Sequence, residues 1–131
     1  MPTVLVVDDD PSLRSAMRRQ PNSAGYDVLE ASDGEEAMGA LAEHRVDLLL
    51  VDIFMPEVDG MELTIRVLRQ MPDARIIAMS GGGTVDKHDA LDIARRVGAI
   101  GTLTKPFTME ELLEAVRGVL GEGPSTAGRR P

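Results

Sequence analysis

Five short apolar runs alternate along the chain with amphipathic stretches of about ten to fifteen residues. The apolar runs predict strands at residues 3–7, 27–31, 47–51, 75–79 and 100–103. The amphipathic stretches predict helices at residues 34–44, 61–70, 86–97 and 109–120, and a further helix from Pro11. Strands that alternate with helices form a parallel sheet with right-handed crossovers and helices on both faces. The pattern therefore predicts an α/β domain with a doubly wound, five-stranded parallel sheet.

The length of the chain limits how many domains it can form. At 131 residues it fits one domain that buries roughly two thirds of its unfolded surface around a single core. Residues 122–131, EGPSTAGRRP, are mostly small or polar and include two prolines, which is typical of flexible segments. We therefore expect one domain over residues 1–121 and a flexible tail or the start of a linker over residues 122–131.

Charge and hydropathy exclude several classes of function. The chain has 14 Lys and Arg against 22 Asp and Glu, a net charge of -8, and it lacks a basic stretch that could follow a phosphate backbone. No apolar run approaches the roughly 20 residues of a membrane span, and the N-terminus has no signal-peptide pattern. Cys is absent. We therefore expect a cytoplasmic protein that binds neither nucleic acid directly nor a membrane.

Polar side chains that could act together follow the first, third, fourth and fifth predicted strands. Three consecutive aspartates, residues 8–10, come directly after the first strand, and the third strand runs into Asp52. Ser80 follows the fourth strand, and the fifth leads to Lys105. In open parallel sheets the carboxyl ends of the strands share one edge, where ligands bind. The sequence therefore predicts a single polar site at that edge.

These residue types suit the binding and transfer of a phosphoryl group. Adjacent carboxylates repel one another unless a cation lies among them, and Mg²⁺ prefers such oxygen ligands and commonly bridges to phosphoryl oxygens. Asp52 can supply the attacking oxygen. Lys105 and Mg²⁺ can neutralise the phosphoryl oxygens, and Ser80 can donate a hydrogen bond to one of them.

Four motifs, VLVVDDD, VDIFMPEVDG, AMSGGG and LTKPF, resemble those of the receiver domain of two-component response regulators. The resemblance extends over about residues 3–120. It implies the flavodoxin-like strand order 2-1-3-4-5. It also implies a phosphorelay signalling switch rather than an enzyme, with a histidine kinase or a histidine phosphotransfer protein as phosphodonor and an unknown downstream protein as partner.

The resemblance also implies a role for individual residues. Asp52 corresponds to the phospho-acceptor, Lys105 to the lysine that contacts the phosphoryl group, and Ser80 to the hydroxyl residue that follows the group on activation. The implied Mg²⁺ ligands are the side chains of Asp8, Asp9 and Asp52 and the backbone carbonyl of Phe54.

One position departs from the family pattern. Receivers usually carry Tyr or Phe three residues before the lysine, and the ring turns inward when the aspartate is phosphorylated. This chain has Thr102 there, and its only aromatic residues are Tyr26, Phe54 and Phe107. The departure puts in doubt how phosphorylation changes the output surface of the domain. It does not affect the phosphoryl chemistry.

Two other functions are compatible with parts of the pattern. DDDPS nearly fits the DxDx[TV] motif of haloacid-dehalogenase-like phosphatases, in which Asp8 would be the nucleophile and Asp10 the acid/base. That enzyme class needs a further acidic pair on a late strand, and only one helix and the tail follow Lys105. A degenerate receiver used only for binding is a third alternative, against which the set Asp9, Asp52, Ser80 and Lys105 argues.

Overall fold

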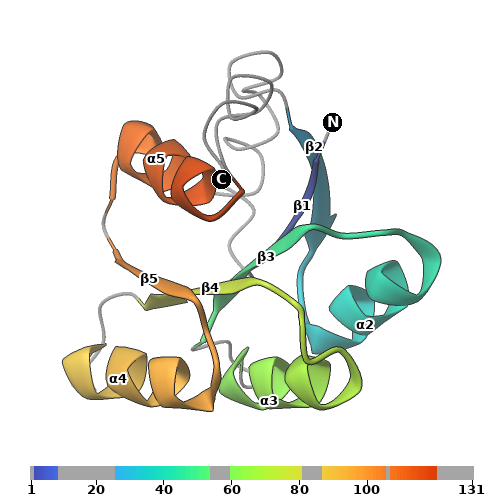
Figure 1. Cartoon of the computed structure of the whole chain (residues 1–131), viewed down its shortest axis with the longest axis horizontal. Coiled ribbons are helices and arrows are strands. Elements are labelled where there is room, and N and C mark those ends of the chain that lie inside the picture. The colour runs from blue at the N-terminus through green and yellow to red at the C-terminus, as the bar shows by residue number, and fades with distance from the viewer. Residues whose placement is uncertain (1, 9–25, 54–59, 81–86, 106, 121–131) are drawn as a thin grey trace.

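The structure is a computed structural model that describes residues 2–8, 26–53, 60–80, 87–105 and 107–120. Within these ranges a 5-stranded parallel sheet is formed by β1 (Thr3–Val7), β2 (Asp27–Ala31), β3 (Leu48–Asp52), β4 (Ile76–Ser80) and β5 (Gly101–Thr104). The described helices are α2 (Gly34–Glu43), α3 (Gly60–Gln70), α4 (Lys87–Val97) and α5 (Met109–Leu120). The strand order β2-β1-β3-β4-β5 confirms the doubly wound, flavodoxin-like sheet (Figure 1).

Two predicted segments cannot be compared with the structure. The helix expected from Pro11 and the tail expected at residues 122–131 both lie outside the described residues. Within the described part of the chain, no helix has the length and hydropathy that a membrane span requires.

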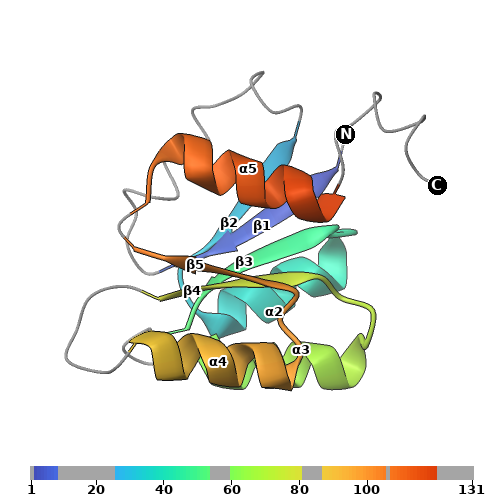
Figure 2. The same ribbon diagram turned by 60° about the vertical axis from the view of Figure 1, so that its left-hand side comes forward.

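Helices cover both faces of the sheet, as the alternating pattern predicts. On one face α5 packs against residues of β1, β3 and β4 that include Val6, Leu50 and Met79. On the other face α2 and α3 pack against the intervening residues of the same strands, including Leu5, Leu49 and Ile76, and α4 adjoins β4 through Ala94 and Ala78. Figure 2 shows α5 on one side of the sheet and α2, α3 and α4 on the other. Because successive strand residues point to opposite faces, continuous apolar runs are needed to fill both layers.

Three strands are displaced by one residue from their predicted positions. β3, β4 and β5 end at Asp52, Ser80 and Thr104, one residue after the predicted ends. Backbone pairing continues through these polar residues, with Asp52 opposite Met79 and Ser80 opposite Thr104. The backbone that carries the candidate site residues Asp52 and Ser80 is therefore held within the sheet.

Side-chain caps fix the beginnings of two helices. At α2, the Asp33 carboxylate accepts a hydrogen bond from the Glu36 backbone N–H, and Glu36 accepts one from the Ser32 N–H. At α5, the Thr108 hydroxyl accepts from the Glu111 N–H while the Glu111 carboxylate accepts from the Thr108 N–H. Both arrangements satisfy backbone donors that a helix leaves unpaired at its start. The cap at Thr108 lies three residues after Lys105 and so fixes the chain close to it.

Helix α3 begins in direct contact with the end of β3. Gly60, its first residue, is buried. A Cβ atom at this position would overlap the backbone oxygen of Asp52 and lie 2.6 Å from the Cα of Ile53. Since backbone atoms cannot move aside as a flexible side chain can, only glycine fits here. The strand-end pattern alone does not predict this requirement.

We expect Gly60→Ala to destabilise the domain by about 1–3 kcal/mol or more, because the added methyl group displaces the backbone at Asp52. Gly39→Ala, an exposed site inside α2 with no atom within 4 Å of the added carbon, is the matched control. That change should stabilise the domain by roughly 0.5–1 kcal/mol. Urea unfolding of both variants measures the difference. Equal stability of the two variants would contradict the close contact at Gly60.

Candidate functional site

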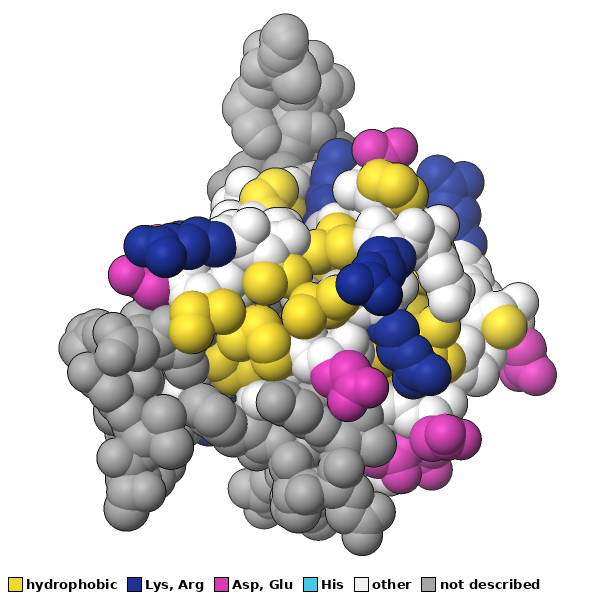
Figure 3. Space-filling view, turned by 90° about the horizontal axis from the view of Figure 1, so that it is seen from below, with side chains coloured by type: hydrophobic (Ala, Val, Ile, Leu, Met, Phe, Trp, Pro, Cys, Tyr) yellow, Lys and Arg dark blue, Asp and Glu magenta, His cyan; other side chains and the backbone are white. Residues whose placement is uncertain are grey.

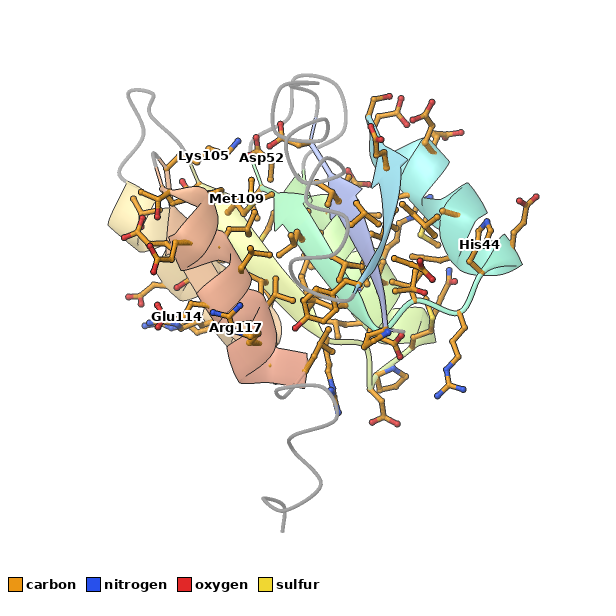
Figure 4. All side chains as sticks on the ribbon, turned by 90° about the horizontal axis from the view of Figure 1, so that it is seen from above. His44, Asp52, Lys105, Met109, Glu114 and Arg117 are labelled. Atoms are coloured by element: carbon orange, nitrogen blue, oxygen red, sulfur yellow. The ribbon has the colours of Figure 1, made fainter. Side chains whose placement is uncertain are left out.

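Four polar residues meet at the carboxyl edge of the sheet. Asp8 directly follows β1, Asp52 is the last residue of β3, Ser80 is the last residue of β4, and Lys105 directly follows β5. In Figure 4 the labelled side chains of Asp52 and Lys105 lie next to each other at this end of the sheet. The structure thus brings together residues that are up to 97 positions apart in the sequence.

Backbone hydrogen bonds extend the sheet past its strand ends and hold the site residues in place. The N–H of Asp8 donates to the carbonyl of Ala31 at 3.1 Å, and the N–H of Lys105 donates to the carbonyl of Ser80 at 2.7 Å. After β3, the N–H of Ile53 donates to the carbonyl of Met79 at 2.9 Å. Asp8, Ile53 and Lys105 are therefore each held by a backbone hydrogen bond to a neighbouring strand.

The Lys105 ammonium joins the two carboxylates. Its Nζ donates to Asp8 Oδ2 at 2.7 Å and to Asp52 Oδ2 at 3.2 Å. The Asp8 side chain is fully buried, the Asp52 side chain is 9% exposed, and Lys105 is 25% exposed. An ion pair removed from water is stabilising only when its geometry and hydrogen bonds compensate for lost hydration. The Lys105 ammonium meets this condition, because it donates a hydrogen bond to each carboxylate. These contacts also link the ends of β1, β3 and β5 at the edge of the sheet.

The same contacts change the acidity of Lys105. Burial acts to lower the pKa of its ammonium, because a charged group loses hydration there. The hydrogen bond to Asp8 and the negative charges of Asp52 and Asp8 act in the opposite direction. Their sum raises the pKa of Lys105 above its ordinary value. Lys105 is consequently a permanent positive charge at neutral pH.

The hydroxyl of Ser80 is buried close to this edge. Ser80 is fully buried, and its Oγ makes no hydrogen bond with the described residues. A buried hydroxyl without a partner costs roughly 1–3 kcal/mol relative to one that is hydrogen-bonded. Ser80 is therefore a donor for which an acceptor arriving at the site would be favourable.

Oxygen donors at this edge match the ligand preference of Mg²⁺. Two buried carboxylates already share one cation, the Lys105 ammonium, and within this trio negative charge is in excess. Carboxylate oxygens are typical Mg²⁺ ligands, and such sites usually take only one or two of them from the protein. Asp9 and Phe54, the other two predicted ligands, lie outside the described residues. Among the residues that are described, no three acidic, His or Cys side chains form a metal-binding group.

Thr102 takes part in a contact that the sequence does not predict. Its Oγ1 accepts a hydrogen bond from Arg95 Nη2 of α4 at 2.9 Å, in an exposed setting. A hydroxyl held by a guanidinium therefore stands at the position where an aromatic ring is usual, and it joins α4 to β5.

A family model for the response regulator receiver domain matches residues 4–117. The response regulator MprA of Mycobacterium sp. (strain KMS) is 36% identical over 129 residues, which cover 94% of this chain and 54% of that protein. MprA of Mycobacterium avium (strain 104) is 38% identical over 118 residues, which cover 89% of this chain and 50% of the relative. The chain thus spans about half the length of these curated relatives.

Solved structures of the same kind share the fold. A receiver domain protein from Clostridium thermocellum superimposes with a TM-score of 0.82 at 25% identity, covering 92% of this chain and 94% of the other. The response regulator TrrA from Thermotoga maritima, solved in complex with Mg²⁺ and BeF, gives a TM-score of 0.77 at 30% identity, covering 91% and 99%. From the sheet order, the strand-edge residues and these matches, the chain belongs to the response regulator receiver domain family of two-component systems.

Proposed function

We propose that this receiver domain is a phosphorylation switch that accepts a phosphoryl group on Asp52 from a histidine kinase or a histidine phosphotransfer protein. The observation that carries the proposal is the convergence of Asp52, Asp8 and Lys105 at the carboxyl edge of the sheet. A carboxylate that is anchored by backbone pairing and adjoins a fixed ammonium is suited to attack an anionic phosphoryl group, because the positive charge offsets their repulsion.

In the proposed transfer, an Asp52 carboxylate oxygen attacks the phosphorus atom of a phosphohistidine. A P–O bond forms while the P–N bond of the donor breaks, and the imidazole nitrogen keeps the electron pair and takes a proton from solvent. The product is an acyl phosphate on Asp52. Lys105 shifts its hydrogen bond from the carboxylates to a phosphoryl oxygen, and the Ser80 hydroxyl gains an acceptor that none of the described residues supplies.

Asp8 and Asp52 would hold Mg²⁺ together with Asp9 and the Phe54 carbonyl. When bound, the ion supplies positive charge that lowers the repulsion between the Asp52 carboxylate and the incoming phosphoryl group. Lys105 occupies the same two carboxylates in the structure, at 2.7 Å and 3.2 Å. The Lys105 ammonium would therefore compete electrostatically with a bound metal ion for the Asp8 carboxylate.

The burial of the two aspartates favours Asp52 over Asp8 as the phospho-acceptor. Asp8 has no exposed side-chain surface, and its Oδ2 is the closer partner of Lys105. Asp52 keeps some exposure and ends the strand that leads into the IFMPEVDG segment. The lower exposure of Asp8 and the match to the receiver domain family both argue against the phosphatase alternative with Asp8 as nucleophile.

The proposed partners follow from the same chemistry. The proposed switch requires a phosphodonor and a downstream protein that recognises its phosphorylated surface. We infer that the domain meets both in the cytoplasm. The chain's net charge of -8 argues against direct contact of this domain with nucleic acid. The domain acts as a signalling module that promotes its own phosphorylation and dephosphorylation rather than as an enzyme with a separate substrate.

Asp52→Asn should abolish the formation of an acyl phosphate, because the amide cannot act as the nucleophile. The measurement is intact mass after incubation with Mg²⁺ and acetyl phosphate, with Asp73→Asn, an exposed site in the turn after α3, as control. The native chain and the control should gain a phosphoryl group, and a chelator should prevent it. Labelling that persists in Asp52→Asn and disappears in Asp8→Asn would instead support the phosphatase alternative.

Lys105→Ala should slow phosphoryl transfer by about tenfold or more while Mg²⁺ affinity stays equal or rises by up to about tenfold. The reason is that Lys105 pairs with the carboxylates of Asp8 and Asp52 and competes with a cation for them. Isothermal titration with Mg²⁺ and the intact-mass assay measure the two effects. Arg45→Ala removes a positive charge at an exposed site after α2 and is the matched control. A large loss of Mg²⁺ affinity in Lys105→Ala would show that the ammonium organises the metal site instead.

A further inference from the structure

The adjoining sides of α3 and α4 form a partly exposed apolar strip. On α3, Met61, Ile65 and Leu68 follow one another at intervals of four and three residues and therefore share one side of the helix. On α4, Ile93 and Val97 are four residues apart. All five side chains are at least partly exposed, and Ile93 is 49% exposed. Figure 3 shows this side of the molecule, with apolar side chains gathered into a continuous patch.

The two halves of the strip adjoin each other. Met61 packs against the cluster that includes Ala94 and Ala99 at α4. At the other end, Leu68 of α3 lies against Gly98, the residue that follows α4, so closely that a Cβ atom there would lie 2.8 Å from its Cδ1. The α3–α4 face, as we call this strip with its flanking charges, is thus a single surface rather than two separate patches.

Charges on this face are ordered along the helix axes. The acidic residue of α3 is in its first turn, Glu62, and its basic residues, Arg66 and Arg69, follow towards its end. On α4, Asp92 precedes Arg96 in the last turn. Right-handed parallel βα units make the two helices run in the same direction, so Glu62 precedes its arginines along α3 in the same direction as Asp92 precedes Arg96 along α4. None of these five exposed side chains has an ion-pair partner among the residues that the structure describes.

We propose that the α3–α4 face is the docking surface for a second copy of this chain, in a two-fold symmetric dimer. A two-fold axis that crosses the strip near Ile65 and Ile93, perpendicular to the helices, places each helix against its counterpart in the opposite direction. Glu62 of one copy then faces Arg66 and Arg69 of the other, and Asp92 faces Arg96. The apolar strips meet at the centre. Such a self-complementary surface is what an isologous contact requires.

The charge of the molecule favours this occupant over a separate acidic partner. The whole chain has a net charge of -8, so two copies repel each other over most of their surface. The α3–α4 face carries three arginines against two acids and is therefore one of the places where copies can approach without that repulsion. A purely acidic partner would match the arginines but would oppose Glu62 and Asp92. The proposal does not depend on the phosphoryl chemistry at Asp52.

The test is sedimentation velocity of the full chain over a concentration series that reaches about 1 mM. The native chain should form dimers in this range, and Ile93→Asp should shift the midpoint to at least about tenfold higher concentration. Ile93→Leu should dimerise like the native chain. Arg45→Glu, a charge reversal outside the face, should behave like the native chain as well. A native chain that stays monomeric throughout overturns the proposal.

Charge reversal on α3 distinguishes the two-fold arrangement from any other contact. The double variant Arg66→Glu/Arg69→Glu makes α3 uniformly acidic on this face, and Glu62→Lys makes it uniformly basic. Each variant alone should dimerise at least about tenfold more weakly than the native chain, and an equimolar mixture should recover association as a heterodimer. Both changes are at exposed positions, and circular dichroism checks that the fold is retained. A mixture that associates no better than its components overturns the proposal.

Discussion

The bridge from the Lys105 ammonium to two buried carboxylates is the interaction on which the rest of the site depends. It joins the ends of β1, β3 and β5, although β1 and β5 are not neighbours in the sheet. Two carboxylates that are removed from water and contact the same ammonium would repel each other strongly without that cation. The ammonium therefore holds the Asp8 and Asp52 carboxylates close together at the edge of the sheet.

This arrangement rests on ordinary features of a parallel sheet. Strand alternation puts Val6 and Leu50 on the face covered by α5, and Asp8 and Asp52 continue the same two rows beyond the apolar layer. Gly60 lets α3 begin against the backbone of Asp52. The alternation of side chains along β1 and β3 therefore does two things. It fills the core with apolar residues, and it sets the direction of the candidate site carboxylates at the strand ends.

Most of the fold could be predicted from the sequence because strands buried on both faces are continuous apolar runs. The ends of β3, β4 and β5 could not, since Asp52, Ser80 and Thr104 are polar and look like residues outside a strand while their backbones still pair. The identity of the site residues follows from their place after strands, but the closer pairing of Lys105 with Asp8 does not. That contact depends on the conformation that the flexible Lys105 side chain adopts among several carboxylates. The spacing of residues in the sequence does not predict this conformation. The Arg95 to Thr102 contact and the requirement for Gly60 depend in the same way on distances between elements.

The Ser80 hydroxyl, which has no hydrogen-bond partner among the described residues, has a thermodynamic consequence for the domain. A donor that is desolvated at rest raises the free energy of the resting state, by roughly 1–3 kcal/mol for a buried hydroxyl. Any state in which that hydroxyl finds an acceptor recovers this amount, and by linkage the recovered free energy adds to the affinity for whatever supplies the acceptor. Under the proposed function, a phosphoryl group on Asp52 would supply such an acceptor, so this free energy would favour the phosphorylated state.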